Sequence, residues 1–88
     1  MFSITKGEKR IISIDVSIDA PDYSISNYTY TLSKDGVVEE TGTPILQEHT
    51  LYCYVEPTKI GGYVLTFEFD LGTGEHIIKS TAINVFPL

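Results

Sequence analysis

The sequence contains one cysteine, no tryptophan and few positive charges. The single cysteine, Cys53, has no partner for an internal disulfide bond, so packing alone must hold the fold, as is usual for cytosolic proteins. Twelve Asp and Glu residues against six Lys and Arg residues give a net charge of −6. Such a chain repels nucleic-acid phosphates and anionic lipid, and Glu8 interrupts its densest group of cations, which is Lys6, Lys9 and Arg10. Neither a nucleic-acid partner nor a membrane partner is expected.

Long apolar runs are also lacking. No stretch approaches the roughly 20 apolar residues that cross a bilayer, and the first residues do not have the apolar segment of a secretory signal. We therefore expect synthesis in the cytoplasm without a signal peptide. A hydrophobic share of 42% with 20% charged residues is typical of a folded protein, and 88 residues have room for one core, in a single domain over 1–88. A domain of this size without disulfide bonds is marginally stable, so self-association would add to its stability.

Apolar and polar residues alternate along much of the chain, and this period of two is typical of β-strands with one buried face. The alternation is clearest over residues 63–71, which we expect to form a central strand. Further strands are expected at 12–18, 26–32, 37–41, 50–56 and 75–86, with a short segment at 45–46, and Pro, Gly or Asp-Gly turns separate them. The apolar parity changes within 75–86, which predicts a β-bulge near Lys79.

Six to eight short strands with frequent turn signals describe an antiparallel sandwich or a small barrel. A five-stranded barrel would need fewer and longer strands, and it would usually present a basic, aromatic groove that this acidic chain lacks. We therefore predict an all-β fold, an antiparallel β-sandwich of about seven strands.

Three stretches of the chain resemble immunoglobulin-like domains of phage baseplate and tail-fibre proteins and of related bacterial surface modules. Residues 4–10 (ITKGEKR) are similar to the KGD start of those domains, and residues 34–42 (KDGVVEETG) are similar to their central hairpin. Residues 61–67 (GGYVLTF), followed by 72–76 (GTGEH), are similar to their ending. The resemblance implies an immunoglobulin-like β-sandwich with a structural role in a virion and no catalytic residues. The Tyr-rich stretch at 51–55 departs from the usual pattern of the family.

Tyr52 and Tyr54 are the candidate binding residues. If the residues that alternate with them face the core, both rings point outward, and in an immunoglobulin-like order the adjacent strand presents Ser13, Asp15 and Ser17. Rings, hydroxyls and a carboxylate on one flat patch, with Asp15 as its charged member, suit sugar stacking or contact with another protein. The alternative is that the tyrosines only cover sheet edges, or that the two faces are reversed. Tyr63 is interpreted as a tyrosine corner, with its hydroxyl bound to a nearby turn.

No combination of residues has the spacing of a catalytic centre. His49 and His76 adjoin expected turns, without Ser, Cys or carboxylate partners at the spacing of a triad or a zinc site, so we interpret both as solvated turn residues. Cys53 alternates with Leu51 and Val55 on the expected buried face, where a thiol behaves as a small apolar group. We therefore expect Cys53 to belong to the core and the protein not to be an enzyme.

Metal and cofactor sites are not expected either. Calcium needs six to eight oxygen ligands, and the Asp-Ala-Pro-Asp stretch at 19–22 is not a dense Asp/Asn/Gly loop. Turn capping is therefore the preferred interpretation of the candidate carboxylates, which are Asp15, Asp19, Asp22 and Asp70. The Gly72-Thr73-Gly74 turn would need a helix behind it to hold a phosphate, and a strand is expected there instead.

These observations together predict a non-catalytic structural or protein-interaction module. The resemblance favours a phage or prophage virion component of a tail or baseplate, with protein partners, and self-association of the chain stays open. The alternative is a carbohydrate- or cell-surface-binding module that uses Tyr52 and Tyr54.

Overall fold

The computed structural model describes residues 2–16 and 24–88, and every regular element in them is a β-strand. The strands are β1 (Phe2–Thr5), β2 (Arg10–Asp15), β3 (Ile25–Lys34), β4 (Val37–Gly42), β5 (Ile45–Gln47), β6 (Thr50–Val55), β7 (Gly61–Leu71) and β8 (His76–Phe86). Each strand expected from the alternation is present with ends that differ by a residue or two. The end of the stretch expected at 12–18 lies outside the described residues.

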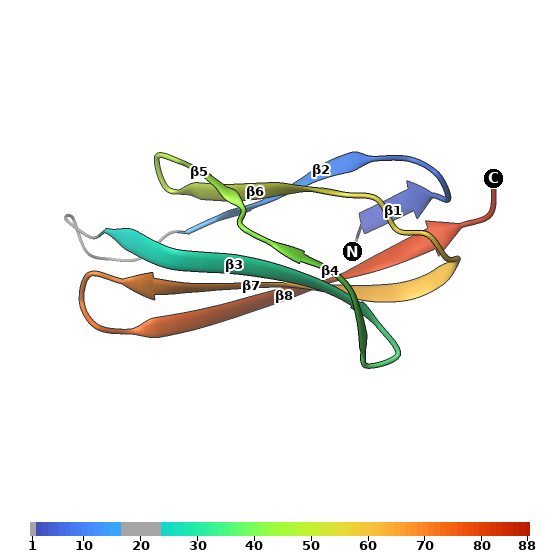
Figure 1. The fold of residues 1–88 in the computed structure, drawn as a ribbon. Helices are drawn as coiled ribbons and strands as arrows, with labels where there is room; N and C mark the ends of the chain where they lie inside the picture. The colour runs from blue at the N-terminus through green and yellow to red at the C-terminus, as the bar shows by residue number, and fades with distance from the viewer. Residues whose placement is uncertain (1, 17–23) are drawn as a thin grey trace.

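The eight strands form two sheets that pack face to face (Figure 1). The larger sheet has the order β1-β8-β7-β3-β4, and the smaller sheet has the order β2-β6-β5. Immunoglobulin-like sandwiches place strands B, D and E on one sheet and strands C, F and G on the other, which is the distribution of β2, β5 and β6 against β3, β7 and β8. The predicted immunoglobulin-like β-sandwich is therefore confirmed.

Two details differ from the expected antiparallel sandwich of about seven strands. β1 forms a strand at a stretch where none was expected, and it pairs in parallel with β8, with Phe2 opposite Ile83. The other strand pairings are antiparallel. β1 joins the larger sheet, whereas β2, the next strand in sequence, belongs to the smaller sheet, so the first residues of the chain connect the two layers.

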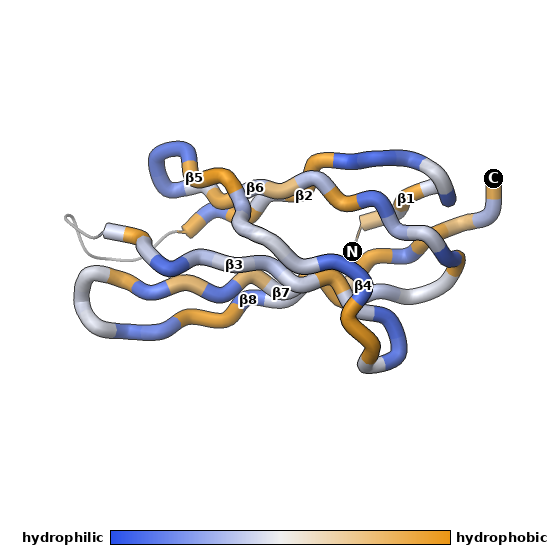
Figure 2. Tube along the Cα trace, in the orientation of Figure 1, coloured by the Kyte–Doolittle hydropathy of each residue, from blue (hydrophilic) through white to orange (hydrophobic). Residues whose placement is uncertain are grey.

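β7 supplies the centre of the core. From Tyr63 on, every second residue of this strand is buried, and hydrophobic and hydrophilic residues alternate along its trace (Figure 2). The inward-facing residues are each at most 3% exposed; they are Tyr63, Leu65, Phe67, Phe69 and Leu71. The smaller sheet covers them with the inward-facing residues of β2 and β6, which are Ile12, Leu51, Cys53 and Val55. The alternation therefore reports the inner and outer faces of the strands correctly.

The β-bulge expected near Lys79 is not present. The register between β7 and β8 is continuous, from Gly61 opposite Val85 to Asp70 opposite His76. Lys79 points to the inner side of the sheet, opposite Phe67, and is nevertheless exposed. The reason is that β1 pairs only with the last residues of β8, so the first half of β8 is a sheet edge where an inward-facing side chain reaches solvent. The apolar residues therefore change from one side of β8 to the other along a regular strand, because the first half of β8 is a sheet edge and needs no apolar residue at position 79.

Irregular pairing occurs along β3 instead. The register shifts between Ser26 and Thr29 against β7, where Asn27 has a φ of 50°, and again between Leu32 and Ser33 against β4. An extra residue in one strand bends it and strengthens the local twist. The first extra residue lies in β3, between Ser26 and Thr29, and the second lies in β4, where Glu39 is inserted between Val38 and Glu40.

Cys53 is buried as expected, with 3% of its surface exposed. Burial raises the pKa of its thiol to about 12, with a further contribution from the negative charge of Glu40. Because the thiolate is the reactive form, we expect iodoacetamide at about pH 8 to leave the native protein unmodified and to alkylate it fully in denaturant. Intact-mass measurement over time gives the alkylation rates of the native and of the denatured protein. Equal rates in the two states would contradict the placement of Cys53 in the core.

Candidate functional site

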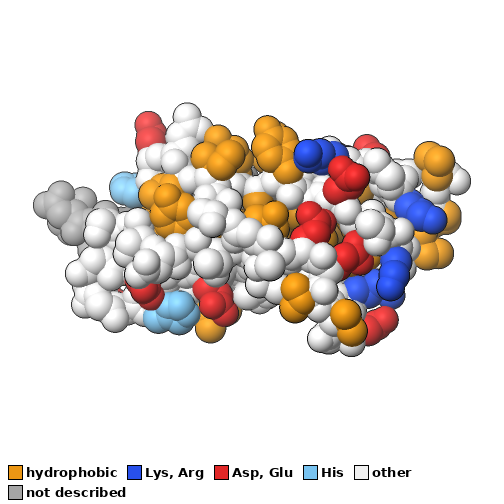
Figure 3. Space-filling view, viewed as in Figure 1, with side chains coloured by type: hydrophobic (Ala, Val, Ile, Leu, Met, Phe, Trp, Pro, Cys, Tyr) orange, Lys and Arg blue, Asp and Glu red, His pale blue; other side chains and the backbone are white. Residues whose placement is uncertain are grey.

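The outer face of the smaller sheet carries the two candidate tyrosines. Its residues are Ile11, Ser13, Asp15, Ile45, Gln47, Thr50, Tyr52 and Tyr54, and we call this surface the tyrosine face. Leu51, Cys53 and Val55 face the core, so Tyr52 and Tyr54 point outward as predicted. Hydrophobic side chains gather along this side of the molecule in the space-filling view (Figure 3).

Strand register places apolar side chains next to both rings. Tyr54 lies opposite Ile11 on β2, and Tyr52 lies between Ser13 on β2 and Ile45 on β5. Tyr54 and Ile45 are each 47% exposed, and Ile11 is 55% exposed. These exposed apolar residues lie next to one another on three adjacent strands, and contiguous exposed apolar surface can mark a protein-interaction site.

Asp15 lies at one end of the tyrosine face rather than between the rings. It pairs with Thr50, one row beyond Tyr52, and its Oδ1 accepts a hydrogen bond of 2.8 Å from Thr50 Oγ1. At the other end, Lys9 Nζ lies 5.6 Å from the centre of the Tyr54 ring, a cation–π arrangement. The patch therefore has an apolar centre with a carboxylate at one end and an ammonium at the other. Ser17, the third polar neighbour expected, lies outside the described residues.

Sequence reasoning missed Ile11 and Ile45. The sequence did contain the information for Ile11. It directly precedes Ile12, and adjacent residues of a strand point to opposite faces, so Ile11 had to lie on the outer face. Ile45 belongs to a strand of three residues, in which no period can be recognised. Only the pairing of β5 with β6 places Ile45 beside Tyr52.

A second polar group lies on the outer face of the larger sheet, at the end of the β7–β8 hairpin. His76 Nδ1 lies 2.6 Å from Asp70 Oδ1, and His76 Nε2 lies 3.8 Å from Glu68 Oε2. Asn27 Nδ2 donates a hydrogen bond of 3.0 Å to Asp70 Oδ2. The hydrogen bonds from Asn27 and His76 lower the pKa of Asp70. These exposed contacts link β3, β7 and β8 across the sheet.

His76 has a carboxylate partner in Asp70, and no serine is paired directly beside it within the described part of β8. Ser80 shares the outer face of β8 with His76, but it lies two rows farther along, and its Oγ is 3.1 Å from Thr66 Oγ1. His49 is an exposed residue in the turn between β5 and β6, where its carbonyl oxygen accepts a hydrogen bond from Val16. His49 is an exposed turn residue as the sequence predicts, whereas His76 is the first residue of β8 and is bonded to Asp70 on the adjacent strand. Within residues 2–16 and 24–88, no three His, Cys, Asp or Glu side chains are placed to hold a metal ion.

Turn capping was the wrong interpretation for two of the candidate carboxylates. Asp15 and Asp70 lie within β2 and β7, and each bonds to a side chain on an adjacent strand. Each carboxylate lies at a strand end beside a side-chain donor of the adjacent strand, and it accepts a hydrogen bond from that donor instead of from the amides of a nearby turn. Asp19 and Asp22 lie outside the described residues.

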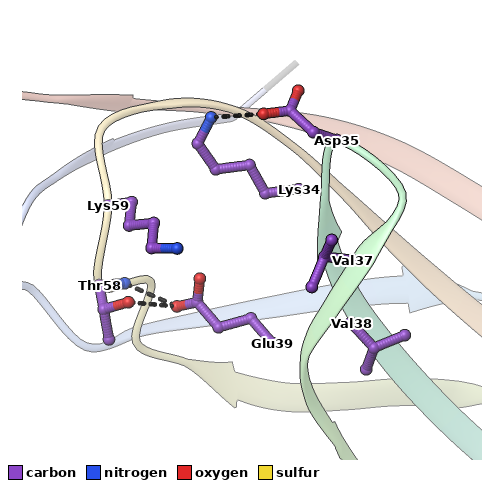
Figure 4. A pocket seen from close by; sticks show the side chains of 7 residues that line it. All are labelled: Lys34, Asp35, Val37, Val38, Glu39, Thr58 and Lys59. Carbon is purple, nitrogen blue, oxygen red and sulfur yellow. Dashed lines mark hydrogen bonds and ion pairs between the residues drawn. The ribbon is translucent and has the colours of Figure 1, made fainter.

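A surface pocket of about 520 Å³ opens between the β3–β4 turn and the β6–β7 loop (Figure 4). Its lining residues are Lys34, Asp35, Val37, Val38, Glu39, Thr58 and Lys59. Lys34 Nζ lies 3.1 Å from Asp35 Oδ2, and Glu39 Oε1 accepts hydrogen bonds of 2.8 Å from both the amide and the hydroxyl of Thr58. Both carboxylates of the pocket already have partners, which suits them to shaping the loop rather than to proton transfer.

The Tyr63 hydroxyl binds the same β6–β7 loop, as the interpretation of a tyrosine corner requires. Its hydroxyl donates a hydrogen bond of 2.6 Å to Glu39 Oε2 and accepts one of 3.1 Å from the Lys59 amide. Burial acts to raise the pKa of Glu39, but the hydrogen bonds from Tyr63 and Thr58 and the charge of Lys59 together lower it. The corner therefore stabilises an ionised carboxylate that joins β4, β7 and the loop between β6 and β7.

Comparisons with known proteins bear on the fold. No family model matches the chain, no curated protein matches it, and no helix in the described part of the chain could cross a membrane. A solved structure from Bacteroides vulgatus ATCC 8482, described as a "putative glycoside hydrolase", aligns with a TM-score of 0.68 at 12% sequence identity. The alignment covers 100% of this chain and 17% of that protein. At this identity the likeness concerns the fold alone. The chain thus has the fold of one segment of a much longer protein.

Proposed function

We propose that this chain is a non-catalytic protein-interaction module whose partner packs on the tyrosine face. The observation that carries the proposal is the exposure of Ile11, Ile45 and Tyr54, which are about half exposed on a sheet whose opposite side packs against the core. Protein interfaces combine an apolar, aromatic centre with a polar rim, and the rim here consists of Ser13, Asp15, Gln47 and Lys9. The partner that fits is a protein surface with an apolar centre and an acidic group opposite Lys9.

A photo-cross-linking amino acid at position 54, introduced in cells that naturally make the chain, tests the proposal. We expect a protein adduct of one defined mass, which Ile45→Lys abolishes because it puts a charge into the apolar centre. The matched control carries the same cross-linker at Ser80, an exposed position on the outer face of the other sheet. No adduct at position 54, or the same adducts from both positions, would overturn the proposal.

The proposal includes the virion setting that the resemblance to phage tail and baseplate domains implies. It rests on the motifs at 4–10, 34–42 and 61–76. Gene neighbourhood tests it directly. Tail or baseplate genes beside this one are the expected result, and a metabolic locus without them would count against it.

A carbohydrate-binding role is the second candidate. It is supported by Tyr52 and Tyr54 on one flat strand and by the likeness of the fold to one segment of a protein described as a glycoside hydrolase. Sugar rings stack on aromatic faces, but the aliphatic Ile11 and Ile45 beside the rings offer a sugar no hydrogen bonds. We therefore place it second. A glycan array separates the two candidates: no binding by the wild-type chain removes this one, and binding that Tyr52→Ala abolishes favours it.

A further inference from the structure

β2 is an edge strand that is open to pairing. It forms one side of the smaller sheet, and within the described residues its second side has no strand partner. An unpaired edge presents amide and carbonyl groups that can extend a sheet into another chain. We propose that two copies of this chain associate through their β2 edges in antiparallel orientation, with Ile12 opposite Ile12 of the second copy.

The remaining edges of the fold carry features that oppose such pairing. β5 has three residues, β1 has four, and the pairing of β4 is interrupted by a register shift. The free half of β8 holds Lys79 on the inner side of its sheet, a placement that discourages edge-to-edge contact. β2 has six residues without Gly, Pro or a bulge. Its one inward-side charge, Arg10, stands at its end, 3.6 Å from Glu8.

The charges at the two ends of β2 select the register. Residues opposite each other in an antiparallel pair point to the same side of the sheet, so the inward Ile12 must meet an inward residue. With Ile12 on the two-fold axis, Ile11 lies opposite Ser13, and Lys9 lies opposite Asp15 of the second copy. Lys9 already sits over the Tyr54 ring on the tyrosine face, and Asp15 is bonded to Thr50 on that same face. Both charges therefore lie on the correct side for two symmetric ion pairs.

With Ser13 on the axis instead, the carboxylate of Asp15 would face the apolar side chain of Ile11. This register loses both ion pairs and places the Asp15 carboxylate against a hydrophobic group, which costs free energy. Arg10 lies opposite an apolar residue in either register, Ile14 in the Ile12-centred one, so Arg10 does not distinguish them. Charge complementarity thus favours the Ile12-centred register. In that register the two three-stranded sheets become one continuous sheet, and the two tyrosine faces lie side by side and remain exposed. The association uses the edge of β2, and its ion pairs use Lys9 and Asp15 from the rim of the tyrosine face, so it leaves the apolar centre of that face uncovered for the partner proposed above.

Sedimentation velocity across a concentration series tests the proposal on wild type, Lys9→Glu, Asp15→Lys and the double variant. We expect reversible dimers of the wild type. Each single variant should weaken association about tenfold, because two attractive cross-strand pairs become repulsive. The double variant restores the attraction with exchanged signs, so its dimerisation should return to nearly the wild-type level.

Lys79→Glu is the matched control, since it changes charge by the same amount on an edge that the proposal does not use. It should leave association unchanged. Circular dichroism of each variant verifies the fold, and Lys9 precedes β2 in an exposed stretch, so Lys9→Glu keeps the sheet intact. A wild-type chain that stays monomeric at about 1 mM, a double variant as weak as the single ones, or an equal effect of Lys79→Glu would overturn the proposal.

Discussion

Phe67→Ala is expected to lower the free energy of unfolding by about 3–5 kcal/mol. The Phe67 side chain is fully buried, in the middle of β7, and β7 itself lies between β3 and β8. Removing the ring takes away its transfer free energy and leaves a cavity that the neighbouring strands cannot close, because both are held in register. Small domains have total stabilities of about 5–15 kcal/mol, so this loss is a large fraction of the total, and the variant should unfold at a much lower urea concentration than the wild type.

Urea titration followed by far-ultraviolet circular dichroism measures this effect, and tyrosine fluorescence provides a second probe because the chain has no tryptophan. Val64→Ala is the matched control. Val64 lies on the same strand but on the outer face, where it is 44% exposed. A surface truncation of this kind should change stability by about 0.5 kcal/mol or less. Equal losses in the two variants would show that the two faces of β7 do not differ in burial.

Tyr63→Phe is expected to cost about 1–3 kcal/mol, because it removes a hydroxyl that both donates to Glu39 and accepts from the Lys59 amide. The ring itself is 1% exposed and fits equally well as phenylalanine, so the loss reports the hydrogen bonds and not the packing. Chemical denaturation at neutral pH measures it. Tyr28→Phe, which alters a partly buried tyrosine beside the core, serves as the control and should have little effect.

The same network makes the contribution of Glu39 to the free energy of unfolding depend on pH. The pKa of Glu39 is lower in the folded state than the ordinary value of 4.5. A lowered folded pKa gives stability that is fully present above about 4.5 and is lost as the pH falls through the folded value. The difference between wild type and Glu39→Gln should therefore narrow as the pH drops from about 6 to about 3. A gap that stayed constant over this range would show that the charge of Glu39 contributes nothing.

The comparison with wild type isolates Glu39 from other groups that titrate in the same range. The pKa of Glu8 is lowered by hydrogen bonds from Thr5, and that of Asp70 is lowered by hydrogen bonds from Asn27 and His76. Both groups remain in Glu39→Gln, so their contributions to acid sensitivity cancel in the difference.

Local alternation predicted the strands and their inner faces because the period of two is a property of a single extended segment. β7 is the clearest example: its five inward residues were identified from sequence and are all buried. The outward direction of Tyr52 and Tyr54 followed from the same reasoning, since a strand with Leu51, Cys53 and Val55 in the core must turn its other side chains to the surface.

Alternation gave a wrong prediction at a sheet edge, where a side chain that points to the inner side of the sheet can still be exposed to solvent. The parity change in β8 predicted a bulge at Lys79, but the strand is regular and only its environment changes. The parallel β1, which covers just the end of β8, leaves the inner side of the first half open at the edge. The sequence of β8 cannot distinguish a β-bulge from a regular strand whose inward-facing Lys79 is exposed to solvent. The two cases differ only in which strand pairs beside β8.

The sequence by itself determined that this protein is a β-sandwich, which side of each long strand faces the core, that Cys53 lies in the core, and that the Tyr63 hydroxyl binds a nearby turn. Tertiary structure decided the composition of the tyrosine face. It brought Ile11 and Ile45 beside the rings, moved Asp15 to the end of the face, and left β2 as an open edge. The physical reason is that side-chain direction follows from the local geometry of one strand, whereas neighbours follow from register and strand order, which depend on packing between segments far apart in the chain.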